Sequence, residues 1–131
     1  MIAVAEYIIG HEFIREPNAF LETGYVIQSH THNHHHNTHL TYGLWEVHRF
    51  QPIVGNDGQQ LRDKDGEPMW TALPVVKVKG GGPRSIIPIP ANMKHKFIVL
   101  EGPAFYRCCF VHRDDEGKPS EIYHGYDGAY Q

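Results

Sequence analysis

The sequence lacks the long apolar stretches of a membrane protein. Its 131 residues are 40% hydrophobic, yet the longest apolar stretches, such as Ile86–Ile89 and Phe97–Leu100, have the length of a strand. A membrane-spanning helix needs about 20 such residues. The amino terminus, Met1–Glu6, has no basic start and reaches a charge after five residues, unlike a secretory signal. We therefore expect a cytoplasmic protein with no membrane partner.

Basic residues are not in excess. Lys and Arg total 12, against 15 Asp and Glu, which gives a net charge of −3. A protein that holds nucleic acid by neutralising phosphates needs clustered basic side chains. The charge balance therefore argues against nucleic acid as a partner.

Cysteine is scarce, and its two copies are adjacent, at Cys108 and Cys109. Neighbouring residues of a strand point to opposite faces, so a disulfide between these two would be strained. We interpret them as small apolar strand residues, with a reactive or metal-binding thiol as the alternative. Two cysteines that are not joined by a disulfide fit a protein of a reducing compartment.

Helical periodicity is nearly absent. No window of twelve or more residues carries apolar residues at helical spacing without an interrupting Gly or Pro, and Glu16–Glu22 alone is compatible with a single helical turn. Turn residues separate short runs rich in Val, Ile, Tyr, Phe and Thr, which are typical of strands. The expected strands are Ile2–Ile9, Tyr25–Ser29, Thr38–Phe50, Met69–Val78, Ser85–Ile89, Lys96–Leu100 and Ala104–His112. This pattern predicts an all-β sandwich or barrel with little helix.

Histidine, in contrast, is abundant. Six of the 11 histidines lie between His30 and His39. Alternate residues of a strand share a face, so His30 and His32 are close enough to share one cation, and imidazole suits Zn, Fe(II), Ni and Cu. A solvated low-complexity tract that binds metal adventitiously is the alternative. A purification tag is disfavoured because tags sit at termini.

The histidines form part of a longer pattern over residues 24–43. A Gly is followed after five residues by His-x-His, then after three residues by a third His and after six more by a Gly. The residues in this pattern are Gly24, His30, His32, His36 and Gly43. The segment resembles the first motif of the cupin superfamily, G-x5-H-x-H-x3-E-x6-G, with His36 where the family most often has Glu.

A second segment, residues 82–99, resembles the second cupin motif, G-x5-P-x-G-x2-H-x3-N. Pro90 and His95 match that motif at the right interval. The segment departs from the motif at Arg84 for the first Gly (Gly82 being two residues early), at Asn92 for the second Gly and at Val99 for the Asn. Asn at the second position is tolerable, because Asn adopts the left-handed conformation more readily than other non-glycine residues.

The resemblance implies a cupin-type jelly roll, a double-stranded β-helix, as a single domain over residues 1–131. It also implies one divalent transition-metal ion in the bowl of the fold, with Fe, Zn, Ni, Mn and Cu left open. Carried over position by position, the metal ligands are His30, His32, His36 and His95. A register slip would exchange His34 for His36. The histidines that match no ligand position, expected to be exposed or structural, are His11, His35, His39, His48, His112 and His124.

Three functions remain open, and the first of them is an oxygenase that acts on a small anionic or enolisable substrate chelated to the metal. This is the preferred interpretation, although the 2-His-1-carboxylate triad usual for iron is absent. The second is a non-redox isomerase, lyase or hydrolase, whose general base would be Glu46, Tyr42 or Tyr106. The third is a non-catalytic cupin that binds a small ligand. Four neutral imidazoles leave the cation at +2, which favours an anionic oxygen ligand.

Cupins of this size are frequently homodimers that pair edge strands. The resemblance therefore implies a homodimer, and the Ile2–Ile9 strand is a suitable edge because an unpaired edge strand is a liability.

Overall fold

The computed structural model describes residues 4–9, 12–31 and 35–111, excluding the side chains of residues 8, 9, 30 and 111. These segments form strands, turns and loops without a helix, and hence without a helix able to cross a membrane. The strands are β1 (Val4–Ile9), β2 (Glu12–Pro17), β3 (Val26–His30), β4 (His36–Pro52), β5 (Trp70–Ala72), β6 (Val76–Lys79), β7 (Ile86–Ile89) and β8 (Lys94–Val111). The predicted all-β class is confirmed.

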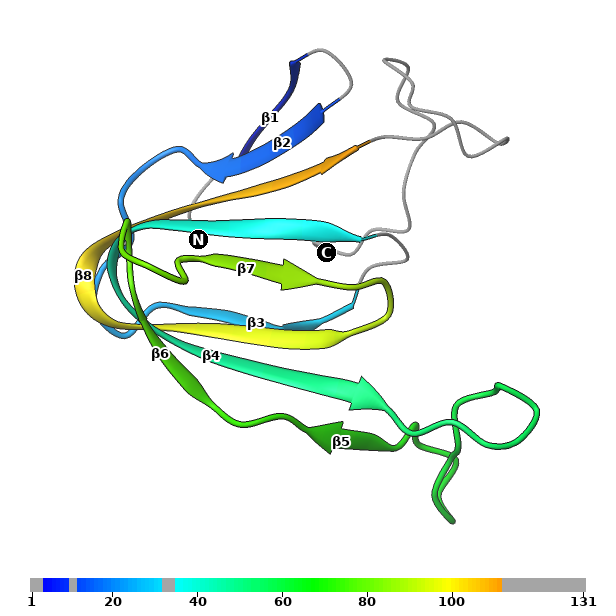
Figure 1. Ribbon diagram of the computed structural model, residues 1–131. Coiled ribbons are helices and arrows are strands. Elements are labelled where there is room, and N and C mark those ends of the chain that lie inside the picture. The colour runs from blue at the N-terminus through cyan, green and yellow to red at the C-terminus, as the bar shows by residue number, and fades with distance from the viewer. Residues whose placement is uncertain (1–3, 10–11, 32–34, 112–131) are drawn as a thin grey trace.

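Two long strands, β4 and β8, run through both layers of the fold (Figure 1). The first part of β4 pairs with β7 and with the last part of β8, and that sheet continues through β2 to β1 at its edge. The second part of β4 pairs with β5, β6 and the first part of β8, which also pairs with β3. Because both long strands bend at the same side of the molecule, the two layers face each other and are joined there.

The space between the layers is filled with apolar side chains. Trp45, which is fully buried, makes edge contacts with the rings of Phe97 and Tyr106 at centroid distances of 6.3 and 6.1 Å. Its indole Nε1 donates a hydrogen bond of 2.8 Å to the carbonyl oxygen of Tyr42. Aromatic pairs of this geometry add about 0.5–1.5 kcal/mol to the stabilisation from area burial. The core therefore lies between the sheets, close to the bend.

The bend itself depends on a close approach of two backbones. Gly43 has φ +92°, and a Cβ on it would lie 2.6 Å from the Cβ of Ala104 and 2.9 Å from its Cα. An L residue is strained at this φ and its side chain would collide with β8. This explains in physical terms why residue 43 is a glycine.

The bend also changes which residues face the interior. Strict alternation from buried His36 would place Glu46 inside, but the β4–β8 ladder has register shifts between Leu40 and Trp45. Beyond them, Trp45 and Val47 are fully buried. Because alternate residues of a strand share a face, Glu46 points outward.

Three sequence-based expectations about the elements are wrong, and one strand was not expected. Glu16–Glu22 is not a helical turn: it contains the end of β2 and a loop whose Leu21 bridges to Ala104. The expected strand Met69–Val78 is two strands, β5 and β6, separated by a segment that contains Pro74, which cannot donate to a ladder. The two strands expected over 96–112 are one bent strand, β8, and β2 was not expected as a strand.

Candidate metal centre

Two of the sequence-predicted ligands, His36 and His95, meet at the end of the molecule opposite the bend. His36 begins β4 and His95 lies at the start of β8, and their side chains are only 4% and 1% exposed. Their ring centroids are 5.4 Å apart. The backbone of His30, at the end of β3, pairs with His95 in the antiparallel register. Segments far apart in the sequence thus bring three of the four positions to one end of the fold.

A backbone contact fixes the orientation and tautomer of His95. Its Nδ1 lies 3.0 Å from the carbonyl oxygen of Met93. A carbonyl oxygen can only accept, so Nδ1 carries the proton and Nε2 carries the lone pair. A metal-binding histidine characteristically donates its other N–H to a carbonyl or carboxylate in this way.

The spacing of the two rings fits a shared cation. An imidazole nitrogen binds a transition metal at about 2.1 Å, which puts the ion roughly 3.2 Å from the ring centroid. Two rings on one ion, at a bond angle between about 90° and 120°, then have centroids about 4.5–5.5 Å apart. The 5.4 Å between His36 and His95 falls within that range.

The remaining histidines of the cluster are only partly covered by the structure. The side chain of His30 and the whole of His32 and His34 lie outside the described residues. Within the described segments, no three His, Cys, Asp or Glu side chains are grouped as a metal site. His35 is exposed, and its Nδ1 accepts a hydrogen bond of 3.1 Å from the Ala91 N–H. His39 is partly exposed, on the outer face of β4.

Two residues of the segment that leads into His95, both at positions where the second motif has glycine, have a positive φ. Asn92 has φ 66° and Arg84 has φ 65°. Both positions are left-handed, which Asn tolerates and Arg does not favour. Both residues thus adopt a conformation that glycine adopts without strain, and Arg84 adopts it with local strain.

The three candidate general bases lie in different surroundings. Glu46, on the outer face of β4, accepts a hydrogen bond from Nε2 of His48 at 2.7 Å. Tyr42 is 57% exposed and contacts the ring of Phe20 at a centroid distance of 5.3 Å. Tyr106 faces the interior and is 7% exposed, and its burial raises the pKa of its hydroxyl. The structure does not bring these three residues together.

The interior contains few polar groups. The buried polar or charged residues among those described are His36, Thr38 and His95. The Thr38 hydroxyl lies 3.5 Å from the Cys108 sulfur. No carboxylate is among these buried groups.

The two cysteines are both buried and unoxidised. Cys108 belongs to the core between the sheets, while Cys109 lies on β8 opposite Ile14 of β2. Burial, together with a hydrogen bond that the thiol donates to the Glu12 carboxylate, raises the pKa of the Cys109 thiol to about 12. Cys109 is therefore a neutral thiol near pH 7, in keeping with a structural role.

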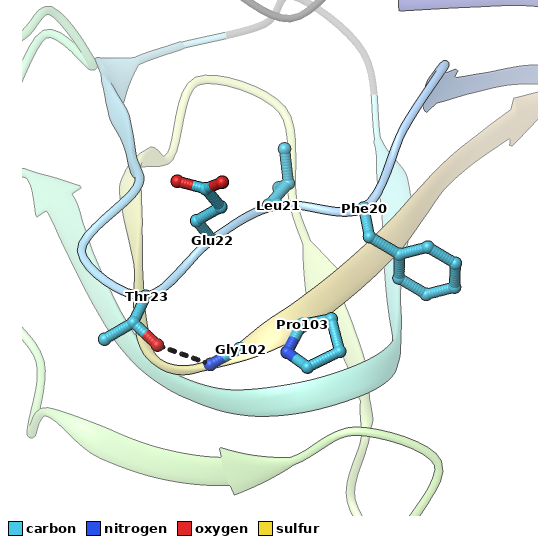
Figure 2. A pocket seen from close by; sticks show the side chains of 6 residues that line it. All are labelled: Phe20, Leu21, Glu22, Thr23, Gly102 and Pro103. Atoms are coloured by element: carbon cyan, nitrogen blue, oxygen red, sulfur yellow. Dashed lines mark hydrogen bonds between the residues drawn. The ribbon is translucent and has the colours of Figure 1, made fainter.

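A hollow of about 550 Å³ lies at the other end of the molecule, beside the bend. Its lining residues are Phe20, Leu21, Glu22, Thr23, Gly102 and Pro103 (Figure 2). The Gly102 N–H donates a hydrogen bond of 2.8 Å to the Thr23 hydroxyl, which ties the β2–β3 loop to the bend of β8. The hollow is open and remote from His36 and His95, and it contains no grouping of catalytic side chains.

One charged residue near the histidines was missed by the sequence analysis. Arg49 of β4 pairs directly with His95 of β8. It follows Trp45 and Val47 at a spacing of two, which is the signal that could have found it. That spacing can be interpreted only once it is known that the bend of β4 changes which of its alternate residues face the interior.

Comparison of the sequence with protein-family models and with curated proteins finds no match, whereas solved structures share the fold. The chain is similar to KdgF from Halomonas sp., with 15% identity and a TM-score of 0.53, over 86% of this chain and 80% of that one. It is also similar to the hydroquinone 1,2-dioxygenase PnpCD, solved in complex with Cd²⁺ and 4-hydroxybenzonitrile, with 15% identity and a TM-score of 0.54, over 80% and 60% of the two chains.

A further likeness is to the L-ribose isomerase of Cellulomonas parahominis, solved with L-ribose, with 18% identity and a TM-score of 0.51. It covers 92% of this chain but 60% of the isomerase chain. These neighbours are all cupin-fold proteins. The facing sheets and the structural likenesses together show that the chain has the fold of a cupin-type jelly roll.

Proposed function

We propose that His30, His32, His36 and His95 bind one divalent transition-metal ion at the end of the cupin bowl. The observation that carries this proposal is the buried pair His36 and His95, whose ring spacing of 5.4 Å suits a shared ion. The Met93 carbonyl supports it by holding His95 in the metal-binding tautomer. Residues 1–131 then form a single metal-binding domain.

We further propose that the chain is an oxygenase-type enzyme for a small anionic or enolisable substrate. When bound, the ion supplies a Lewis acid and, if it is iron, a redox centre. The residues of the chain contribute neutral ligands, which leave the ion its full charge, and an apolar interior that excludes water. The structural likeness to a hydroquinone dioxygenase, solved with Cd²⁺ and an aromatic ligand, supports this choice.

The shortage of interior carboxylates favours the oxygenase over the second candidate function. An isomerase, lyase or hydrolase needs a positioned general base. Among the described residues no buried carboxylate is available, and Glu46 faces outward, bound to His48. The likeness to an L-ribose isomerase keeps the non-redox function as the alternative, and a small-ligand binding cupin is the third outcome of the tests below.

The metal site is tested by elemental analysis of purified variants. His36→Ala and His95→Ala are expected to lose the metal, whereas His39→Ala, on the outer face of the same strand as His36, is expected to keep occupancy near one ion per chain. His30→Ala tests the third position in the same way. Full occupancy in His95→Ala would mean that the second motif has been misinterpreted.

The reaction class is tested separately, after metal loading. Dioxygen uptake by the Fe(II)-loaded protein, with a panel of small phenolic and carboxylic acids, is the expected result. Anaerobic turnover with zinc or nickel would instead select the non-redox function. Tight ligand binding without turnover under either condition would select the binding module.

We also propose that the chain is a homodimer. β1 lies at the edge of its sheet, with its second side unpaired by any described strand. Such an edge is suited to pairing with a second copy. Light scattering that gives the mass of one chain at working concentration would refute this.

A further inference from the structure

Arg49 is placed on the interior face of β4, at the level of His95. The ladder between β4 and β8 pairs Trp45 with Val99, Val47 with Phe97 and Arg49 with His95. The first four of these residues are at most 2% exposed. Residues two apart on a strand share a face, so the third pair continues the same interior row toward the open end of the bowl.

The two members of this pair are near neighbours. Directly opposed residues of an antiparallel ladder have Cβ atoms about 4.5–5.5 Å apart. His95 is fully buried at this position. The Arg49 side chain therefore begins beside the imidazole that we assign to the metal, and its Nε is itself buried.

The positive charge of Arg49 is not matched by a carboxylate in the described part of the chain. Arg15 and Arg107 form ion pairs of 2.9 Å with Glu6 and Glu16. Arg49 forms no such pair there, and its buried Nε has no hydrogen-bond partner among the described residues. A buried N–H of a cationic group is destabilising when it has no hydrogen-bond partner. A ligand that brings a negative charge to this point would remove that penalty.

We propose that Arg49 binds the carboxylate of the substrate, so that the enzyme acts on a small carboxylic acid which contacts both Arg49 and the metal. The inference rests on the proposed metal site. The planar guanidinium matches a carboxylate with two parallel hydrogen bonds. The divalent ion, held by neutral imidazoles, adds a second positive charge close by, so an anion is favoured over a neutral molecule of the same shape.

The test measures binding of benzoate to the zinc-loaded protein by calorimetry, which needs no turnover. Arg49→Gln is expected to weaken benzoate binding about 10- to 100-fold, the usual effect of losing hydrogen bonds to a charged group. Arg49→Lys keeps the positive charge but cannot form the two parallel hydrogen bonds of a guanidinium, so an intermediate loss of benzoate affinity is expected. Benzamide, a neutral molecule of the same shape, should bind wild type and Arg49→Gln alike.

The matched control is Arg62→Gln, which removes an exposed arginine bonded to the Gly66 carbonyl in the β4–β5 connection. It should bind benzoate as the wild type does. Zinc content and thermal unfolding are measured for every variant, so that loss of the fold or of the metal is seen directly.

Two results would overturn the inference while leaving the metal site intact. One is a zinc-loaded Arg49→Gln that binds benzoate as tightly as wild type. The other is a zinc-loaded wild type that does not bind benzoate. A wild type that holds no zinc would instead overturn the proposed function, and the inference with it.

Discussion

Replacement of Gly43 by Ala tests the tight crossing of β4 and β8 on which the bowl depends. The new Cβ would stand 2.6 Å from the Cβ of Ala104 at a backbone φ of +92°. The left-handed conformation costs an L residue about 1–2 kcal/mol, and overpacking a tight contact costs about 1–3 kcal/mol. Gly43→Ala is therefore expected to lower the free energy of unfolding by roughly 2–5 kcal/mol, measured by urea unfolding.

Gly24 supplies a matched control for the backbone part of this loss. Its φ is +89°, and a Cβ added there would have no heavy atom within 4 Å. Gly24→Ala should therefore cost only the conformational part, about 1–2 kcal/mol. The difference between the losses in unfolding free energy of Gly43→Ala and Gly24→Ala measures the cost of the steric clash between β4 and β8.

The double variant Gly43→Ala, Ala104→Gly completes the cycle, because it removes the methyl group that the new side chain meets. Its loss in the free energy of unfolding should be smaller than the sum of the losses of the two single variants by about 1–2 kcal/mol. An equal loss for Gly43→Ala and Gly24→Ala, together with additive behaviour in the double variant, would refute the tight crossing.

Two further changes test other parts of the fold. Arg84→Gly should raise the free energy of unfolding by about 0.5–1 kcal/mol, because it relieves a φ of 65° at the expense of some unfolded-state entropy; a lower melting temperature would contradict this. Burial raises the Cys109 pKa to about 12 from 9.0, so the folded chain keeps a proton that the unfolded chain loses. This stabilisation is complete below pH 9 and lost as the pH rises from about 9 to 12. Urea unfolding across that range should show a shallower decline for Cys109→Ala than for wild type, and equal slopes would contradict the assignment.

The secondary structure was largely predictable wherever local composition decided it. Runs rich in β-branched and aromatic residues became strands, as for β1, β3 and β7. The errors lie where local composition is ambiguous. β2 (Glu12–Pro17), in which apolar and charged residues do not alternate, forms a strand because it pairs with both β1 and β8. Pairing partners of that kind are not visible in the segment itself.

The candidate site was predictable in part for a similar reason. The spacing of His30, His32 and His36 is a local pattern, and the link to His95 came from a resemblance that spans two segments. The register of β3 and β8 and the contact between two rings then brought distant parts of the chain to one end of the fold. The sequence could not predict whether each candidate base points into the bowl or away from it, because that depends on the geometry of the bend.

The sequence by itself determined the strand composition, the turn positions and the histidine spacing, since these rest on local conformational preference and on the chemistry of imidazole. Only the tertiary structure decided which side chains enter the bowl. The register shifts before Trp45 reverse the alternation of β4, turning Glu46 outward and Arg49 inward. The period of a strand is two residues, so a single irregularity exchanges its faces, and irregularities arise where two backbones must cross closely, as at Gly43 and Ala104.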